Sequence, residues 1–369
     1  MPEPHARRRD ALRAELSEQG LDALLVVNLL NVRYLTGFTG SNAALLVRAT
    51  DHAGAEDGTI FCTDGRYLTQ AGRQVPDLQQ VIERQSAEAL ATRAGKDTAA
   101  YGRTGFESQH VTVDGLDVLG SAAEGVELVR APGLVERLRQ VKDDAEVEAL
   151  RMACAAADRA LAGLVRHGSL RPGRTEREVA RELEDQMLDH GAAKPAFETI
   201  VAAGANSSIP HHRPTDAPLR VGDFVKMDFG AVVDGYHSDM TRTVVIGQPA
   251  DWQREIYDLV AAAQAAGRAA LRVGAGVREV DAASREVIEN AGYGEQFLHG
   301  LGHGVGLDIH EAPALSKTGD GRLAAGMAVT VEPGVYLAGK GGVRIEDTLV
   351  VREGDPELLT LTTKQLVVV

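Results

Sequence analysis

The sequence predicts an α+β protein of two domains, an α/β domain over residues 1–131 and a duplicated α+β domain over 132–369. The chain has 369 residues, which is more than one ordinary hydrophobic core accommodates. Helix-like and strand-like segments alternate along the first part, and Pro132-Gly133 marks its end. In the second part a sequence pattern returns after about 100 residues, which indicates an internal duplication.

Composition and charge exclude several classes of function. Hydrophobic residues make up 44% of the chain and charged residues 25%, which is typical of a soluble globular protein. No apolar run approaches the ~20 residues of a membrane span, and the first residues lack a signal-peptide core, so we expect no membrane partner. The formal net charge of −14 argues against nucleic-acid binding, because an acidic surface repels phosphate. The two cysteines lie far apart in the sequence, so we expect a cytoplasmic protein without a disulfide framework.

Each element of the first domain is predicted from its hydrophobic pattern. Apolar residues spaced between charges indicate a helix over 5–19. Short apolar runs indicate strands, and longer amphipathic stretches indicate further helices. The strands are expected over residues 21–27, 43–47 and 59–62, and the helices near 66–74 and 87–94.

The second domain is predicted to begin with a long helix, near residues 143–165. Its apolar residues recur at helical spacing and form one stripe, in which Cys154 lies. We therefore expect Cys154 to be part of the core rather than a reactive thiol.

An internal repeat follows this helix. Residues 170–179 recur as 271–280, and residues 219–230 recur as 323–334. Two copies are too few for a solenoid, so they predict a domain with pseudo-twofold symmetry. The repeat places four acidic residues at equivalent positions, Asp228 with Glu332 and Asp239 with Glu346.

The acidic residues of the first half are predicted to lie on one face of a hairpin. Asp234-Gly235 is a two-residue turn signal between strands expected over 225–233 and 236–245. If Val233 pairs with Tyr236, Asp228 faces Thr241, and Asp239 is the diagonal neighbour of Asp228 at about 7–8 Å. Two such carboxylates repel each other unless a cation lies between them. The second half is expected to repeat the arrangement, although each acid alone is equally explained as a salt-bridge partner on an edge strand.

Three histidines lie in a glycine-rich segment between the repeated strands. They are His299, His303 and His310, and His211 occupies a place in the first half similar to that of His310. Three histidines with four acids predict a metal centre. Four carboxylates and one imidazole suit two divalent cations, with Mn²⁺ favoured and Co²⁺ or Zn²⁺ as alternatives. Two ions about 3.5–4 Å apart support hydrolysis without a covalent nucleophile.

These motifs resemble those of the pita-bread metallopeptidases, which include aminopeptidase P, prolidase and methionine aminopeptidase. The resemblance covers nearly the whole chain and is carried by residues 228–243, 299–310, 330–334 and 342–348. It implies five metal ligands, namely Asp228, Asp239, His303, Glu332 and Glu346. It also implies that Glu332 shuttles a proton to the leaving nitrogen, and that His211, His299 and His310 contact the substrate. Arg344 matches an arginine near the C-terminal side of the substrate.

The first domain resembles the creatinase/prolidase-type amino-terminal domain through residues 31–42 and 63–67. Methionine aminopeptidases usually lack this domain, so the resemblance points to the proline-directed branch. Ala203 stands where the family often has serine, which puts no ligand in doubt. Non-catalytic members and metal-free creatinase are expected to have lost several ligands, whereas all five are present here.

The resemblance implies a dinuclear metallopeptidase that cleaves the bond between an N-terminal residue and a following proline. Xaa-Pro aminopeptidase is the main expectation, and Xaa-Pro dipeptidase (prolidase) is the alternative. A non-catalytic peptide-binding protein is a remoter alternative. The expected partners are small peptides with proline in the second position and further copies of the chain, as a homodimer or a larger assembly. In such an assembly, the first domain would help to enclose the active site of its own or a neighbouring chain.

Overall fold

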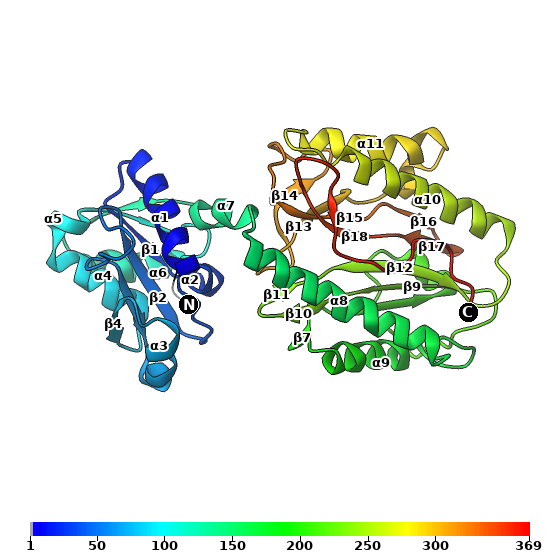
Figure 1. The fold of residues 1–369 in the computed structure, drawn as a ribbon, viewed down its shortest axis with the longest axis horizontal. Coiled ribbons are helices and arrows are strands. Elements are labelled where there is room, and N and C mark those ends of the chain that lie inside the picture. Colours follow the sequence, from blue (N-terminus) through cyan, green and yellow to red (C-terminus); the bar gives the residue numbers. More distant parts are fainter. Residues whose placement is uncertain (1–2) are drawn as a thin grey trace. The chain divides into compact units, whose positions relative to one another are not determined.

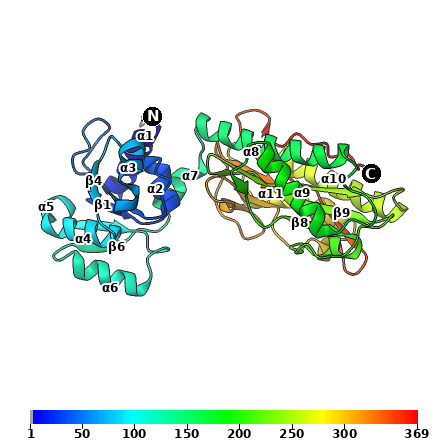
Figure 2. The same cartoon turned by 90° about the horizontal axis from the view of Figure 1, so that it is seen from below.

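The computed structural model describes residues 3–369, which form two compact units (Figures 1 and 2). The first unit ends at Arg139 and the second begins at Gln140, so the division lies after Pro132-Gly133. Helix α7 (Leu134–Gln140) explains the later position of the boundary. Glu136 accepts a hydrogen bond from Nδ2 of Asn31, and Arg139 donates one to Oδ1 of Asn31, each at 2.8 Å. These bonds join most of α7 to the first unit.

The first unit is an α/β domain, as predicted. Its sheet has six strands in the order β4-β3-β2-β1-β5-β6, antiparallel on both sides of β2 and parallel elsewhere. Buried side chains of the central strands pack against α4 and α6. In chain order the elements are α1 (Glu3–Glu18), β1 (Ala23–Val26), α2 (Leu29–Thr36), β2 (Ala43–Arg48), β3 (Ile60–Thr63), α3 (Leu68–Gln74), β4 (Gln79–Ile82), α4 (Ser86–Lys96), α5 (Thr98–Tyr101), β5 (Arg103–Phe106), α6 (Val113–Ala122) and β6 (Glu127–Arg130).

The helices and strands predicted for this unit are confirmed, with ends that differ by a few residues. Helix α2 was not among the predicted elements. It begins at an N-cap, because the Asn28 side chain accepts a hydrogen bond from the Leu30 N–H at 2.9 Å. It ends at Gly37, whose φ of 77° is a conformation that glycine adopts without strain.

The second unit has the predicted duplicated architecture, in which each half pairs two helices with a small sheet (Figure 1). Helices α8 (Asp144–Arg166) and α9 (Glu176–Asp189) share a core with the first half. Helices α10 (Asp251–Ala270) and α11 (Val277–Asn290) share a core with the second half. Cys154 on α8 is fully buried, as expected of a core residue.

The strands of the second unit form several short sheets. The first half contains the order β12-β9-β8, and the second half contains β14-β13-β15-β18-β19. The strands are β7 (Lys194–Pro195), β8 (Ile200–Ala203), β9 (Phe224–Phe229), β10 (Ala231–Val233), β11 (Tyr236–His237), β12 (Met240–Val245), β13 (Gly302–Gly304), β14 (Glu311–Leu315), β15 (Ala328–Val331), β16 (Gly334–Leu337), β17 (Gly341–Arg344), β18 (Asp347–Val350) and β19 (Glu357–Leu358).

The hairpin predicted in the first half has the predicted register. Val233 pairs with Tyr236, and Asp228 pairs with Thr241. The strands are interrupted at Gly230, where a Cβ would lie 1.8 Å from the carbonyl oxygen of Ser238, so a side chain does not fit.

The hairpin of the second half differs in register from that of the first. Thr330 pairs with Thr348, and Gly334 pairs with Arg344. This register sets Glu332 opposite Glu346, whereas Asp228 and Asp239 are diagonal neighbours. The pseudo-twofold symmetry of the sequence is therefore approximate at the acidic residues.

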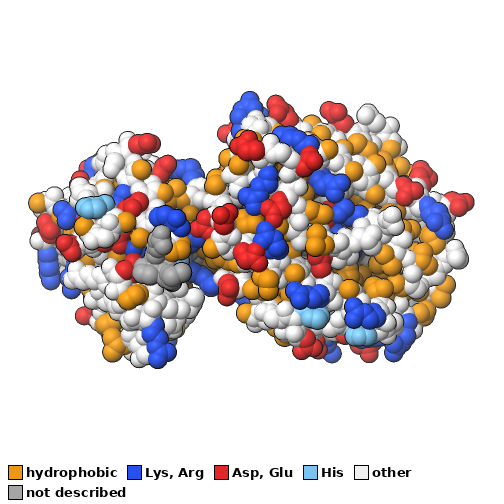
Figure 3. Space-filling model, in the orientation of Figure 1, with side chains coloured by type: hydrophobic (Ala, Val, Ile, Leu, Met, Phe, Trp, Pro, Cys, Tyr) orange, Lys and Arg blue, Asp and Glu red, His pale blue; other side chains and the backbone are white. Residues whose placement is uncertain are grey.

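On the face shown in Figure 3, acidic and basic side chains are interspersed rather than gathered into one basic patch. Among residues 3–369, no helix combines the length and the apolar character that crossing a membrane requires.

Candidate metal centre

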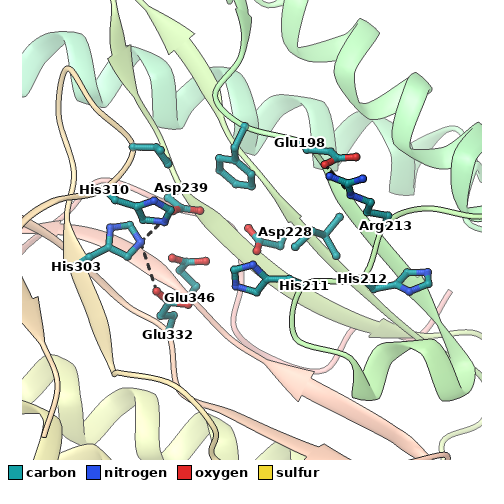
Figure 4. Close-up of a pocket in the computed structure, with 13 residues that line it drawn as sticks. Glu198, His211, His212, Arg213, Asp228, Asp239, His303, His310, Glu332 and Glu346 are labelled. Atoms are coloured by element: carbon teal, nitrogen blue, oxygen red, sulfur yellow. Dashed lines mark ion pairs between the residues drawn. The ribbon is translucent and has the colours of Figure 1, made fainter. Parts of the chain in front are cut away.

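The five predicted ligands meet in one cavity of about 320 Å³ within the second unit (Figure 4). They come from separate parts of the chain: Asp228 lies on β9 and His303 on β13, whereas Asp239, Glu332 and Glu346 lie in the segments that precede β12, follow β15 and precede β18. The cavity is lined by Phe197, Glu198, Ile200, His211, His212, Arg213, Asp228, Asp239, His303, Ile309, His310, Glu332 and Glu346.

His303 directs one ring nitrogen at the carboxylates. Its Nε2 lies 3.4 Å from Oδ2 of Asp239 and 3.5 Å from Oε1 of Glu332. Its Nδ1 lies 3.0 Å from the carbonyl oxygen of Gly304, so the Nδ1–H donates there and Nε2 is left as the ligand atom. Burial alone would lower the pKa of His303, but Asp239 and Glu332 raise it to about 9. The carboxylates therefore favour a positive charge at this position.

The carboxylates form a candidate cluster for cation binding. One ligand atom each from Asp239, His303 and Glu346 lies within 4.8 Å of the others. Oδ1 of Asp228 and Oε1 of Glu346 are buried and have no hydrogen-bond partner among the described residues. Burial and the neighbouring acids raise the pKa of Asp239 to about 6 and that of Glu346 well above its usual range. Buried carboxylate oxygens without donors fit divalent cations, which would satisfy both their charge and their lone pairs.

Thr241 and Arg344 bind two of these carboxylates, those of Glu346 and Asp228, respectively. The Thr241 hydroxyl donates to Oε2 of Glu346 at 2.7 Å and accepts from Nε of Arg344 at 2.9 Å. The guanidinium of Arg344 is ion-paired with Asp228 and is 2% exposed. Arg344 is not among the described residues that line the cavity, and its predicted place near the C-terminal side of the substrate stays a prediction.

His299 also lies outside the set of residues that line the cavity. Its Nε2 is 2.8 Å from the hydroxyl of Tyr336, which in turn accepts a hydrogen bond of 2.7 Å from Arg344. Burial and the nearby Arg344 lower the pKa of His299 to about 3, so its imidazole is neutral. Its predicted contact with substrate stays a prediction. Sequence reasoning did not identify Tyr336, because an aromatic residue in a strand carries no signal of this polar contact.

His211 and His310 lie on different sides of the cavity, as Figure 4 shows. The His310 ring packs edge-on against His303, with ring centroids 4.5 Å apart. The segment that carries His211 is fixed by Lys226, whose Nζ donates to the carbonyl oxygen of Ile209 at 2.6 Å. Lys226 is fully buried, and burial lowers its pKa to about 6. This contact was not predictable from the sequence, because only folding brings Lys226 to that carbonyl.

Glu198 and Arg213 lie at the end of the cavity opposite the carboxylate cluster (Figure 4). Oε2 of Glu198 is 3.1 Å from Nε of Arg213. Neither residue was singled out from the sequence, because an exposed ion pair has no distinctive pattern.

Two family models match the chain, one for each of its two units. The model of metallopeptidase family M24 matches residues 148–353, and that of the creatinase/prolidase N-terminal domain matches residues 8–141. The first match covers more than half of the chain and includes every predicted ligand.

Similar proteins carry the same architecture over their full length. A Xaa-Pro dipeptidase of Pyrococcus furiosus is 34% identical over 95% of this chain and 97% of its own. The solved structure of a Xaa-Pro dipeptidase from Bacillus anthracis has a TM-score of 0.93, 38% identity, and coverage of 99% of this chain and 100% of its own. An X-Pro aminopeptidase structure from Thermotoga maritima has a TM-score of 0.87 and 34% identity, covering 98% of this chain and 99% of its own.

Proposed function

We propose, since this chain belongs to metallopeptidase family M24, that it is a metal-dependent Xaa-Pro dipeptidase. The observation that carries the proposal is the convergence of Asp228, Asp239, His303, Glu332 and Glu346 on one small cavity, where two buried carboxylate oxygens have no hydrogen-bond donor among residues 3–369. Dipeptidase, the alternative in the sequence analysis, is better supported than the main expectation of an aminopeptidase, because Xaa-Pro dipeptidases predominate among the relatives. Aminopeptidase activity is the second candidate, favoured by the similarity to the Thermotoga maritima structure.

The five residues would hold two divalent cations, whose role is to lower the pKa of water and to polarise the carbonyl of the scissile bond. Glu332 takes the proton from the attacking water and gives it to the leaving nitrogen of proline. Glu332 lies at the centre of the site, where its Oε1 is 3.5 Å from Nε2 of His303, and a carboxylate in this position can accept and return a proton. His211 and His310 donate hydrogen bonds from opposite sides to the oxygen on which negative charge develops.

The native metal, the assembly and the compartment complete the proposal. The oxygen-rich ligand set favours Mn²⁺, with Co²⁺ and Zn²⁺ as alternatives. Two buried cysteines in the reduced form suit the cytoplasm. By the family resemblance, the chain forms a homodimer or a larger assembly. Sedimentation at micromolar concentration tests this point, and a single species of 39.2 kDa would contradict it.

The activity is tested by supplying Mn²⁺-loaded protein with substrates of two lengths. Alanyl-proline and alanyl-prolyl-alanine are incubated in parallel, and free alanine is measured. We expect the dipeptide to be cleaved with the higher kcat/KM. Cleavage of the tripeptide alone would identify an aminopeptidase, and cleavage of neither by a metal-loaded protein would favour the non-catalytic alternative.

A further inference from the structure

We propose that Arg213 binds the C-terminal carboxylate of the substrate and thereby selects dipeptides over longer peptides. The inference rests on the proposed dipeptidase function and identifies the side chain that would recognise the free end of the dipeptide. It follows from the charges that line the cavity, from the contacts of the other buried cations, and from the exposure of Arg213.

The cavity is lined by one arginine, and its guanidinium could bind a negatively charged group of the substrate. Asp228, Asp239, Glu332 and Glu346 carry four formal negative charges, which two divalent cations would balance. Among the described residues, Arg213 is the only lysine or arginine that lines the cavity. A dipeptide places its carboxylate next to the scissile bond, so the carboxylate enters this cavity and needs a cation other than the metal ions.

The buried cations near the site are already committed to protein acceptors. Arg344 contacts Thr241 through Nε, Tyr336 through one terminal nitrogen and Asp228 through the other. Lys226 donates to the carbonyl oxygens of Ile209 and Pro210, at 2.6 and 3.3 Å. Binding a substrate carboxylate with either side chain would leave a buried acceptor without its donor.

Arg213 is free of that constraint. Its side chain is 82% exposed, and that of its partner Glu198 is 63% exposed. Exposed ion pairs contribute little to stability, so a substrate carboxylate can replace Glu198. A guanidinium binds a carboxylate through two parallel hydrogen bonds, which fixes its orientation. Phe197 and Ile200 line the same cavity and supply apolar surface for the proline ring.

The test compares a substrate that has the carboxylate with a competitor that lacks it. The Mn²⁺-loaded wild type and Arg213→Gln are assayed for KM and kcat with alanyl-proline, and for inhibition by alanyl-prolinamide. We expect Arg213→Gln to raise KM for alanyl-proline about tenfold or more, with little change in kcat. The inhibition constant of alanyl-prolinamide should differ by less than about twofold between Arg213→Gln and the wild type, because this compound has no carboxylate for Arg213 to bind. Arg213→Lys should recover part of the affinity.

Two further variants separate recognition from a general effect on the loop. Arg220→Gln removes an exposed arginine outside the cavity and should leave both constants unchanged. Glu198→Gln removes the competing carboxylate and should lower KM for alanyl-proline, and a rise would overturn the proposed exchange. An unchanged KM in Arg213→Gln, or an equal loss of amide affinity, would overturn the role of Arg213. Failure of the wild type to cleave alanyl-proline would instead refute the proposed function.

Discussion

The hydroxyl of Thr241 lies 2.7 Å from Oε2 of Glu346, and this hydrogen bond joins the two halves of the duplicated domain. Thr241 is on β12 of the first half, whereas Glu346 directly precedes β18 of the second. The backbone N–H of Glu346 also donates to the carbonyl oxygen of Thr241, at 3.1 Å. These two bonds fix the Glu346 carboxylate and leave its Oε1, which has no donor among the described residues, to a cation.

Replacing Thr241 by valine should weaken metal binding while the fold is kept. Valine is similar in shape but removes the donor to Glu346 and the acceptor for Arg344. We expect metal affinity to fall about 10–100-fold, the usual effect of removing a side chain that hydrogen-bonds to a metal ligand. Titration of the metal-free protein with Mn²⁺ measures it. Thr241→Ser, which restores the hydroxyl, is the control, and equal affinities in all three proteins would contradict the supporting role.

Replacing Asp239 by alanine should remove metal as well as activity. Asp239 is buried, lies 3.4 Å from His303 and belongs to the cluster that contains Glu346. Loss of its carboxylate leaves too little negative charge for two divalent cations. Elemental analysis of the purified variant counts the metal, with Asp258→Ala on the exposed face of α10 as the control. An Asp239→Ala protein with two equivalents of metal and normal turnover would refute the ligand assignment.

The histidines should separate into one ligand and two substrate-contacting residues. His303→Ala should bind metal poorly, because its Nε2 points at the acidic cluster. His211→Ala and His310→Ala should keep their metal and lose about 10²–10³ in turnover, the usual effect of removing a donor to a developing oxyanion. Metal content and kcat, measured on the same preparations, decide the matter. Loss of metal from His310→Ala together with retention in His303→Ala would reverse the assignment.

The free energy of unfolding should depend on pH through Glu176, which binds the segment that follows His211. Its buried carboxylate accepts hydrogen bonds from His212, Thr215 and the N–H of Ala203. Burial alone would raise the pKa of Glu176, but these donors hold it below its usual 4.5. A lowered pKa means that the unfolded state binds more protons in acid. The stabilisation is therefore present above about pH 4.5 and is lost as the pH falls through the folded-state pKa.

Glu176→Gln tests this dependence. At pH 7 the free energy of unfolding should fall by about 1–3 kcal/mol relative to the wild type. The difference should shrink as the pH falls below 4.5 and through the folded-state pKa, where the folded wild type also loses its carboxylate charge. Urea unfolding at several pH values measures it, with Asp185→Asn on the same helix as the control. A difference that is constant between pH 7 and the acid range would show that charge is not involved.

Local signals were sufficient to predict the acidic hairpin of the first half. Asp234-Gly235 is a turn in which Asp234 has a φ of 48° and Gly235 a φ of 78°, which is the geometry this pair favours. Once the turn is fixed, the two-residue period of a strand sets which side chains share a face. The pairing of Asp228 with Thr241 therefore follows from the sequence alone.

The supports of the site were not predictable in this way, because each depends on contacts between distant segments. Tyr336 meets His299 across 37 residues, and Arg344 meets Asp228 across 116. The resemblance placed Arg344 near the substrate, yet its partners are side chains that converge on it only in the folded chain. Helix α2 was missed for a local reason, since its eight residues are too few to establish a clear helical period.

The predicted ligands are spread from Asp228 to Glu346, so both halves of the duplicated domain contribute to the cluster. A chain still being synthesised acquires Asp228 and Asp239 first, and at that stage it lacks the other three predicted ligands that would help to hold a cation between these two carboxylates. The predicted metal centre can therefore form only after the second half has been synthesised and has folded against the first.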